Sequence, residues 1–196
     1  MQFSAAEDKE DCMEVIRTKQ IMDRDEINRT LMRMAHEILE HHQNYEDMIL
    51  IGTRTGGVYL SRIIREKIKK IENIEIPIGT LDITLYRDDL SRIGYQRLVH
   101  KTEVPINIDD RVIVLIDDVL FTGRTVRAAM DALTDLGRPS MIQLAVLVDR
   151  GHRELPIRAD YAGRIISTSR KENVEVIFDD DHLPLKVILQ ELPEQD

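Results

Sequence analysis

Residues 112–125, VIVLIDDVLFTGRT, are the part of the sequence that most constrains the fold. The stretch begins with five apolar residues, most of them β-branched, and such a run is typical of a strand buried on both faces of a parallel sheet. A short polar loop follows, and helical spacing of apolar residues begins at Val126. A buried strand, a loop and a helix in this order form the unit from which α/β sheets are built.

Two adjacent carboxylates, Asp117 and Asp118, follow the apolar run. In open α/β sheets, ligands bind outside the carboxyl ends of the strands, so both side chains are expected at a binding crevice. Neighbouring carboxylates repel each other, which raises one pKa unless hydroxyl groups or a cation share the charge. A sugar diol or a hydrated Mg²⁺ is therefore the expected partner. A helix cap or a surface turn is the simpler alternative.

The loop after the two acids has the composition of a phosphate site. Thr122, Gly123 and Thr125 lie directly before or at the start of a predicted helix, where backbone N–H groups and hydroxyls can surround a phosphate. Gly123 permits backbone angles and close approaches that other residues avoid. The loop lacks the Gly-Lys-Ser/Thr ending of a Walker loop and the GxGxxG of dinucleotide sites, so the pattern favours a phosphorylated sugar over a nucleoside triphosphate.

The rest of the sequence alternates between strand-like and helix-like segments. Asp23 and Glu26 form a capping-box pattern that opens a helix extending to about His42. Strands are predicted at 48–52, 76–85, 111–116 and 141–148, helices at 58–70 and 124–136, and edge strands at 161–166 and 174–178. This alternation predicts one α/β domain with a mainly parallel sheet flanked by helices.

The predicted domain covers 21–180, between a flexible N-terminal tail at 1–20 and a C-terminal tail at 181–196. The polar segment 86–104 is expected to be a mobile arm or a hairpin. Cys12 is the single cysteine, so one chain can build neither a disulfide nor a cysteine zinc site, and a cytoplasmic setting is expected. No membrane segment or metal site is expected. A net charge of -9 excludes a protein coated all round with basic charge for nucleic acid.

VIVLIDDVLFTGRT resembles the 5-phosphoribosyl-1-pyrophosphate signature of the type I phosphoribosyltransferases. The resemblance implies the fold of that family, with a flexible arm and a small hood beside the parallel sheet. It also implies that Asp117 and Asp118 meet the ribose hydroxyls and that Mg²⁺ arrives with the donor. The loop that holds the 5-phosphate would then consist of Val119, Leu120, Phe121, Thr122, Gly123, Arg124 and Thr125.

The segment 52–57, GTRTGG, is similar to the pyrophosphate loop of the same family. The similarity implies that Arg54 and Thr55 bind the diphosphate and that Arg54 acts with the two aspartates in catalysis. Gly56 stands where the family commonly has arginine. A plain tight turn is the alternative interpretation. The arm around Arg87 resembles the family's flexible loop, which closes over the substrates and excludes water.

Further similarity at 81–90, 123–161 and the Thr168-Ser169 pair points to one subgroup, the pyrimidine operon regulators. It implies a uracil phosphoribosyltransferase that binds UMP or UTP and the leader RNA of pyrimidine operons to promote termination, and that forms a homodimer or a larger homo-oligomer. The implied RNA contacts are Arg33, His36, Arg153 and Arg158. Met32 stands where the subgroup often has threonine. A purely catalytic salvage enzyme for uracil or another base remains the alternative.

Overall fold

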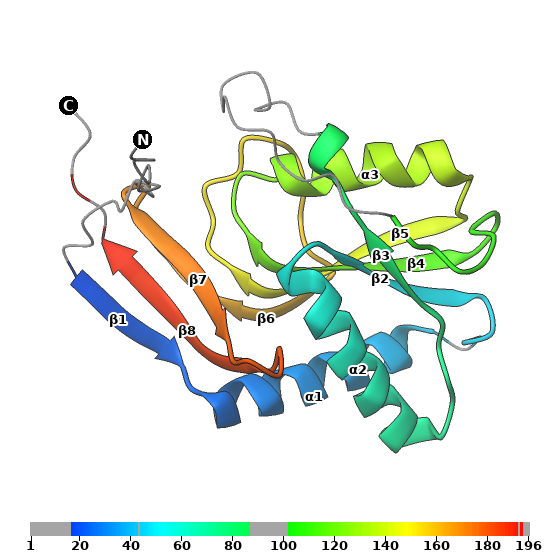
Figure 1. Ribbon diagram of the computed structural model, residues 1–196, viewed down its shortest axis with the longest axis horizontal. Helices are drawn as coiled ribbons and strands as arrows, with labels where there is room; N and C mark the ends of the chain where they lie inside the picture. Colours follow the sequence, from blue (N-terminus) through cyan, green and yellow to red (C-terminus); the bar gives the residue numbers. More distant parts are fainter. Residues whose placement is uncertain (1–16, 43, 87–101, 192, 194–196) are drawn as a thin grey trace, which may run out of the picture.

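A computed structural model describes residues 17–42, 44–86, 102–191 and 193 (Figure 1). Its main sheet has five parallel strands in the order β3-β2-β4-β5-β6. The strands are β2 (Met48–Thr53), β3 (Ile78–Leu81), β4 (Val112–Leu120), β5 (Met141–Asp149) and β6 (Tyr161–Ile165). The predicted parallel sheet is thus confirmed, and β6 is the edge strand expected at 161–166.

Helices cover both faces of this sheet: α3 (Arg124–Leu136) lies on one face, and α1 (Arg24–His41) and α2 (Gly56–Glu72) lie on the other (Figure 1). The capping box of α1 is formed as predicted. The Glu26 N–H donates to the Asp23 carboxylate at 2.7 Å, and the Asp23 N–H donates to the Glu26 carboxylate at 3.0 Å. Bounds for α3 also match the prediction, because Gly123 before it and Gly137 after it stop the helical pattern.

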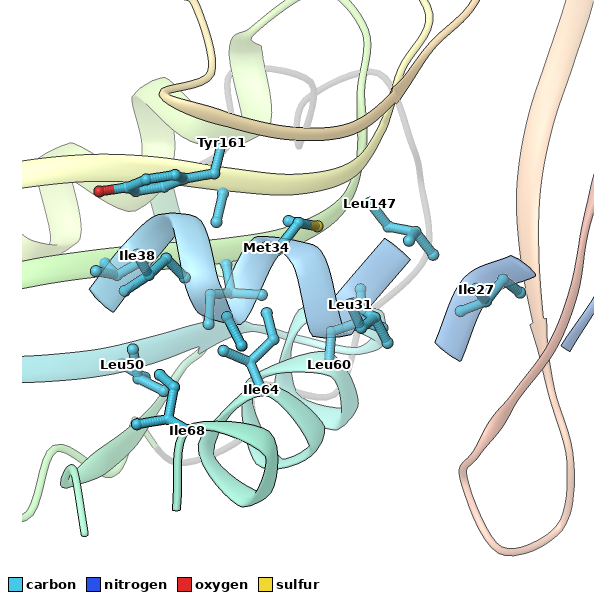
Figure 2. Close-up of a cluster of buried hydrophobic side chains, with 14 of the residues drawn as sticks. Ile27, Leu31, Met34, Ile38, Leu50, Leu60, Ile64, Ile68, Leu147 and Tyr161 are labelled. Atoms are coloured by element: carbon cyan, nitrogen blue, oxygen red, sulfur yellow. The ribbon is translucent and has the colours of Figure 1, made fainter. Parts of the chain in front are cut away.

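Apolar side chains from each helical layer pack on the sheet as two separate cores. On the α1/α2 face, Leu31 and Ile38 of α1 and Ile64 of α2 are fully buried with Leu50 of the sheet and Tyr161 of the edge strand (Figure 2). A smaller cluster lies between the sheet and α3. Burial of β2 and β4 from both sides agrees with their uninterrupted apolar runs.

A second sheet of three antiparallel strands forms the hood, in the order β1-β8-β7. Its strands are β1 (Arg17–Met22), β7 (Glu172–Phe178) and β8 (Pro184–Glu191). An ion pair of 2.7 Å between Arg24 and Asp179 joins the start of α1 to the end of β7. In Figure 1 the hood lies beside the main sheet, on the side away from α3.

The hood corrects three boundaries predicted from the sequence. Parts of the two predicted tails, 1–20 and 181–196, form strands instead, because residues 17–22 pair with residues 187–191. The run at 174–178 is in the hood rather than at the edge of the main sheet. The pairing of strands so far apart in the sequence cannot be predicted from local patterns. The rest of the predicted N-terminal tail, residues 1–16, lies outside the described part of the chain.

The segment predicted as a strand at 76–85 is shorter, since β3 ends at Leu81 and a 3₁₀ turn, η1 (Thr84–Tyr86), follows. The Asp82 carboxylate accepts hydrogen bonds from the N–H and the hydroxyl of Thr84, which turns the chain out of the sheet. Most of the predicted arm, including Arg87, lies outside the described residues. Among the described helices, none has the combined length and apolar character that a membrane crossing requires.

Candidate functional site

Two loops leave the same edge of the main sheet because the strands that carry them are parallel neighbours. In the register of β2 and β4, Gly52 lies opposite Ile116. The segment after β2 therefore emerges beside Asp117 and Asp118. Both aspartates lie within β4, which continues to Leu120, so the strand predicted at 111–116 is longer and the predicted phosphate loop begins inside it. Two loops predicted from separate parts of the sequence are thereby joined into one site.

Asp117 is buried at this junction, with 6% of its surface exposed. Its Oδ1 accepts a hydrogen bond of 2.6 Å from the Thr53 hydroxyl and one of 3.0 Å from the backbone N–H of Asp118. Burial raises the pKa of the Asp117 carboxyl to about 8, and repulsion from Asp118 adds to the rise, although the two hydrogen bonds oppose it. The carboxyl is thus poised to change its protonation state when a polar ligand arrives.

Asp118 points toward the first turn of α2. Its Oδ1 accepts a hydrogen bond of 2.9 Å from the Val119 N–H, and its Oδ2 lies 2.4 Å from the place where a Cβ on Gly56 would stand. A Cβ on Gly57 would lie 2.2 Å from the carbonyl oxygen of Ile116. Both glycines are therefore needed for β4 to approach α2 this closely. The Asp118 carboxylate occupies the space beside residue 56, where the family commonly carries arginine.

The predicted phosphate loop turns sharply at Gly123, whose φ of +92° is a conformation that favours glycine. The Arg124 N–H donates to the Thr122 hydroxyl at 3.3 Å, and α3 begins at Arg124. A helix start with hydroxyls beside it is the arrangement that an anion site requires, and anion binding at this loop stays a prediction.

The other predicted substrate-binding residues differ in how far their side chains are exposed. Arg54 and Thr55 are exposed in the turn before α2, where their peptide bond is cis. Leu120 is buried in the α3-side core, so only its backbone can face a ligand. Phe121 packs under the Arg150 guanidinium, at 3.9 Å from the ring centre. Val119, Thr122 and Thr125 are half-buried, Gly123 is buried, and Arg124 is exposed with an ion pair of 2.7 Å to Glu154.

Of the predicted RNA contacts, Arg33 and His36 of α1 and Arg158 are exposed. Arg33 also pairs with Glu37 and donates to the Gly163 carbonyl at 2.6 Å, which fixes its guanidinium at the outer edge of β6. Arg153 differs from these three residues, because its side chain is only 22% exposed and its nitrogens are bound to protein groups.

Two residues of the site were not singled out from the sequence. Thr53 is fully buried against Asp117, and Arg150 is 4% exposed and donates to the Ser169 carbonyl at 3.0 Å. Thr53 is the last residue of β2, next to the predicted pyrophosphate loop, so its position at the end of a predicted strand could have identified it as a site residue. Arg150 follows β5 in the same way, at the shared carboxyl edge of the sheet.

Within the described residues, no cluster of three or more His, Cys, Asp or Glu side chains could hold a metal ion. The adjacent carboxylates of Asp117 and Asp118 are the acidic groups that the site itself offers. Two carboxylates with a diol and a diphosphate would fill the oxygen coordination that Mg²⁺ prefers. The site therefore fits a metal that is carried by the ligand, with the protein as a minor contributor.

Comparison with known protein families identifies the family of this chain. The model of the phosphoribosyl transferase domain matches residues 17–179, which include both loops, both aspartates and the hood strands β1 and β7. The chain belongs to the phosphoribosyltransferase family. The fold and the family predicted from residues 112–125 are thus confirmed.

Within this phosphoribosyltransferase family, the chain is similar to proteins named "Bifunctional protein PyrR". It is 55% identical over 170 residues to the one of Geobacter sp. (strain M21), a match that covers 87% of this chain and 96% of the relative. The protein of Caldicellulosiruptor bescii is 53% identical over 174 residues, with 89% and 96% covered. This phosphoribosyltransferase therefore belongs to the bifunctional PyrR subgroup, as its sequence predicts.

Solved structures of other phosphoribosyltransferases share the fold at low identity. A hypoxanthine phosphoribosyltransferase of Staphylococcus aureus is 17% identical with a TM-score of 0.65, over 89% of this chain and 92% of that one. The hypoxanthine phosphoribosyltransferase of Trypanosoma cruzi is 20% identical with a TM-score of 0.64, over 90% and 97%. At such identities the likeness concerns the fold alone.

Proposed function

We propose that this phosphoribosyltransferase makes UMP and pyrophosphate from uracil and 5-phosphoribosyl-1-pyrophosphate, and that it also regulates pyrimidine genes by binding leader RNA. The observation that carries the proposal is the meeting of two loops, each predicted to bind an anion, and a buried aspartate at one edge of the sheet. Relatives at 51–55% identity, whose printed name is "Bifunctional protein PyrR", support two activities in one chain.

In the proposed reaction, N1 of uracil bonds to the anomeric carbon of the ribose while the bond from that carbon to pyrophosphate breaks. The proton on N1 is released, and pyrophosphate leaves with both bonding electrons. Positive charge grows on the sugar and negative charge on the leaving oxygens, so the protein acts chiefly by orientation and electrostatics. The loop 119–125 would hold the 5-phosphate, and Asp117 and Asp118 would hold the ribose hydroxyls.

Arg54 and Thr55 would bind the departing diphosphate. Both are exposed beside the first turn of α2, and an arginine matches the charge and geometry of phosphate oxygens. Mg²⁺ would enter with the donor and neutralise part of the diphosphate charge. Arg87, in the segment predicted to close over the substrates, belongs to the same proposed site. Because phosphorylated substrates do not cross membranes freely, we place the activity in the cytoplasm.

The proposed RNA surface consists of exposed basic residues outside the catalytic crevice, namely Arg33 and His36 of α1 and Arg158. The chain as a whole carries a net charge of -9, so affinity would depend on a local patch and fall steeply as salt rises. A homodimer or larger oligomer would join two such patches. UMP or UTP in the crevice would be the signal that sets RNA affinity.

One assay tests the catalytic half of the proposal. With Mg²⁺, the wild-type protein should release pyrophosphate from uracil and the donor. Asp117→Asn and Asp118→Asn should lower kcat/KM by roughly 100-fold or more, because each removes a carboxyl group that would be ionised when the sugar is bound. Arg158→Ala is the matched control and should keep the wild-type rate. An unchanged rate in both aspartate variants would contradict the proposed chemistry.

A second assay separates the regulator from a purely catalytic salvage enzyme. Binding of pyrimidine leader RNA should tighten when UMP is added at fixed salt. Arg33→Ala and Arg158→Ala should each weaken it, by about tenfold per lost phosphate or base contact. Their pyrophosphate release should be unchanged. If wild-type protein does not bind the leader with UMP or UTP present, the salvage alternative holds.

A further inference from the structure

The segment after β5 packs against the back of the predicted phosphate loop. The Arg150 N–H donates to the Leu120 carbonyl at 3.1 Å. The N–H groups of Glu154 and Leu155 both donate to the Thr122 carbonyl, at 2.9 and 3.3 Å. The loop is thus attached through its backbone to a segment about thirty residues further along the chain.

The Arg153 side chain adds two hydrogen bonds to the loop and also binds its own segment. Its Nη1 donates to the Phe121 carbonyl at 2.7 Å, to the Leu120 carbonyl at 3.3 Å and to the Gly151 carbonyl at 3.0 Å. Its Nε donates to the Ile157 carbonyl at 3.1 Å, and its Nη2 pairs with the Asp149 carboxylate. All three guanidinium nitrogens therefore have partners within the protein, which is unlike a side chain that waits at a surface for a phosphate.

A hydrogen bond that fixes the direction of a carbonyl group also fixes the direction of the N–H group in the same peptide unit. In a trans peptide the C=O and the following N–H are antiparallel. Because the carbonyls of Leu120, Phe121 and Thr122 are bound from behind, the N–H groups of Phe121, Thr122 and Gly123 point the other way. None of these three N–H groups donates to another described residue. They remain available to an anion in front of the loop.

We propose that Arg153 is a positioning residue of the phosphate loop: it binds the carbonyls of Leu120 and Phe121 and so helps to aim the N–H groups of Phe121 and Thr122 at the 5-phosphate. This inference rests on the proposed function, since it assumes that the loop binds the phosphate of UMP and of the donor. It assigns Arg153 a different task from that of Arg158, five residues later, whose side chain is exposed. Family resemblance alone would place both residues in the RNA surface.

The discriminating measurement is the affinity for UMP relative to uridine, which has the same base and ribose but no phosphate. Dissociation constants would be measured by calorimetry for wild type, Arg153→Ala, Arg153→Lys and Arg158→Ala. Arg153→Ala should weaken UMP binding by about 10- to 100-fold, the range for losing hydrogen bonds from a charged donor, and leave uridine binding within about twofold. Arg158→Ala, measured without RNA, is the comparison for the neighbouring arginine, and Arg138→Ala, an exposed arginine outside both proposed sites, is the control that should change neither constant.

Arg153→Lys keeps the charge and much of the length, so it tests the proposal if the alanine variant does not fold. It should also weaken UMP selectively, because one ammonium cannot reach carbonyls on several sides as a guanidinium does. Equal weakening of UMP and uridine would mean general destabilisation and would overturn the proposal. Loss of RNA binding with unchanged UMP affinity would also overturn it, and would return Arg153 to the RNA surface.

A different set of binding constants would show that the proposed function itself is wrong. If the wild-type protein bound UMP no better than uridine, the loop would not be a phosphate site, and both the function and this inference would fall. If wild type preferred UMP and the Arg153 variants kept that preference, the function would stand and only the role of Arg153 would be wrong.

Discussion

The raised pKa of Asp117 predicts that nucleotide binding depends on pH. In the free protein, burial and the neighbouring Asp118 raise the pKa of the Asp117 carboxyl to about 8. Ribose hydroxyls donate hydrogen bonds to the ionised form, so a bound nucleotide should lower this pKa. Binding below about pH 8 must then release a proton, and the affinity for UMP should rise with pH up to that point.

The size of the effect follows from linkage. One proton released per nucleotide corresponds to a tenfold change in affinity per pH unit, so UMP should bind up to about 100-fold more tightly at pH 8 than at pH 6. The free energy of unfolding should change in the opposite direction. Between pH 3.8, the ordinary pKa of aspartate, and about 8, the folded carboxyl holds more protons than the unfolded one. The contribution of Asp117 to stability is therefore lost as the pH rises through this window.

Calorimetry of UMP binding from pH 6 to 8.5 would measure the slope, and Asp117→Asn supplies the reference. The amide cannot titrate, so the slope that remains in this variant belongs to the phosphate of UMP, whose second pKa is near 6. Thr53→Val removes the hydroxyl that donates to Asp117 at 2.6 Å and should move the rise in affinity to higher pH. An equal pH dependence in wild type and Asp117→Asn would refute the reasoning.

Two further predictions concern close contacts. Gly56→Ala places a methyl group 2.4 Å from Oδ2 and 3.0 Å from Cβ of Asp118, so the carboxylate must rotate and β4 and α2 must move apart; kcat/KM should fall by about tenfold and thermal stability should fall as well, and Ser61→Ala on the same helix serves as the control. Normal kinetics in Gly56→Ala would contradict the assigned contact. Asp23→Ala removes the N-cap of α1 and should lower the free energy of unfolding by about 1 kcal/mol in urea titrations; an unchanged midpoint would argue against the capping box.

Local patterns in the sequence were sufficient for the elements that position the site. The apolar run before Asp117 predicted a doubly covered strand, and the helix from Arg124 was placed correctly because glycines stand at both of its ends. The capping box of α1 was equally legible, since Asp23 and Glu26 lie three residues apart. These patterns involve residues that are close in the sequence, so they can be recognised without knowledge of the tertiary structure.

Hood strands and supporting side chains could not be predicted because they depend on register between distant segments. The strand Arg17–Met22 has a single buried residue, Met22, and its pairing with Pro184–Glu191 fixes it in place. Asp117 becomes a buried carboxyl only because β2 brings Thr53 beside it. A contact between Arg153 and the carbonyls of a loop thirty residues earlier likewise has no signature in composition or spacing.

The two loops of the site therefore differ in how far their own sequences determine their conformation. The turn before α2 is specified largely by Gly56 and Gly57, whose neighbours leave no room for a side chain. The phosphate loop has Gly123 for its turn, but the direction of its N–H groups depends on carbonyls that are bound from the segment after β5. A change in that segment, such as one at Arg153, should thus alter phosphate binding without touching the loop.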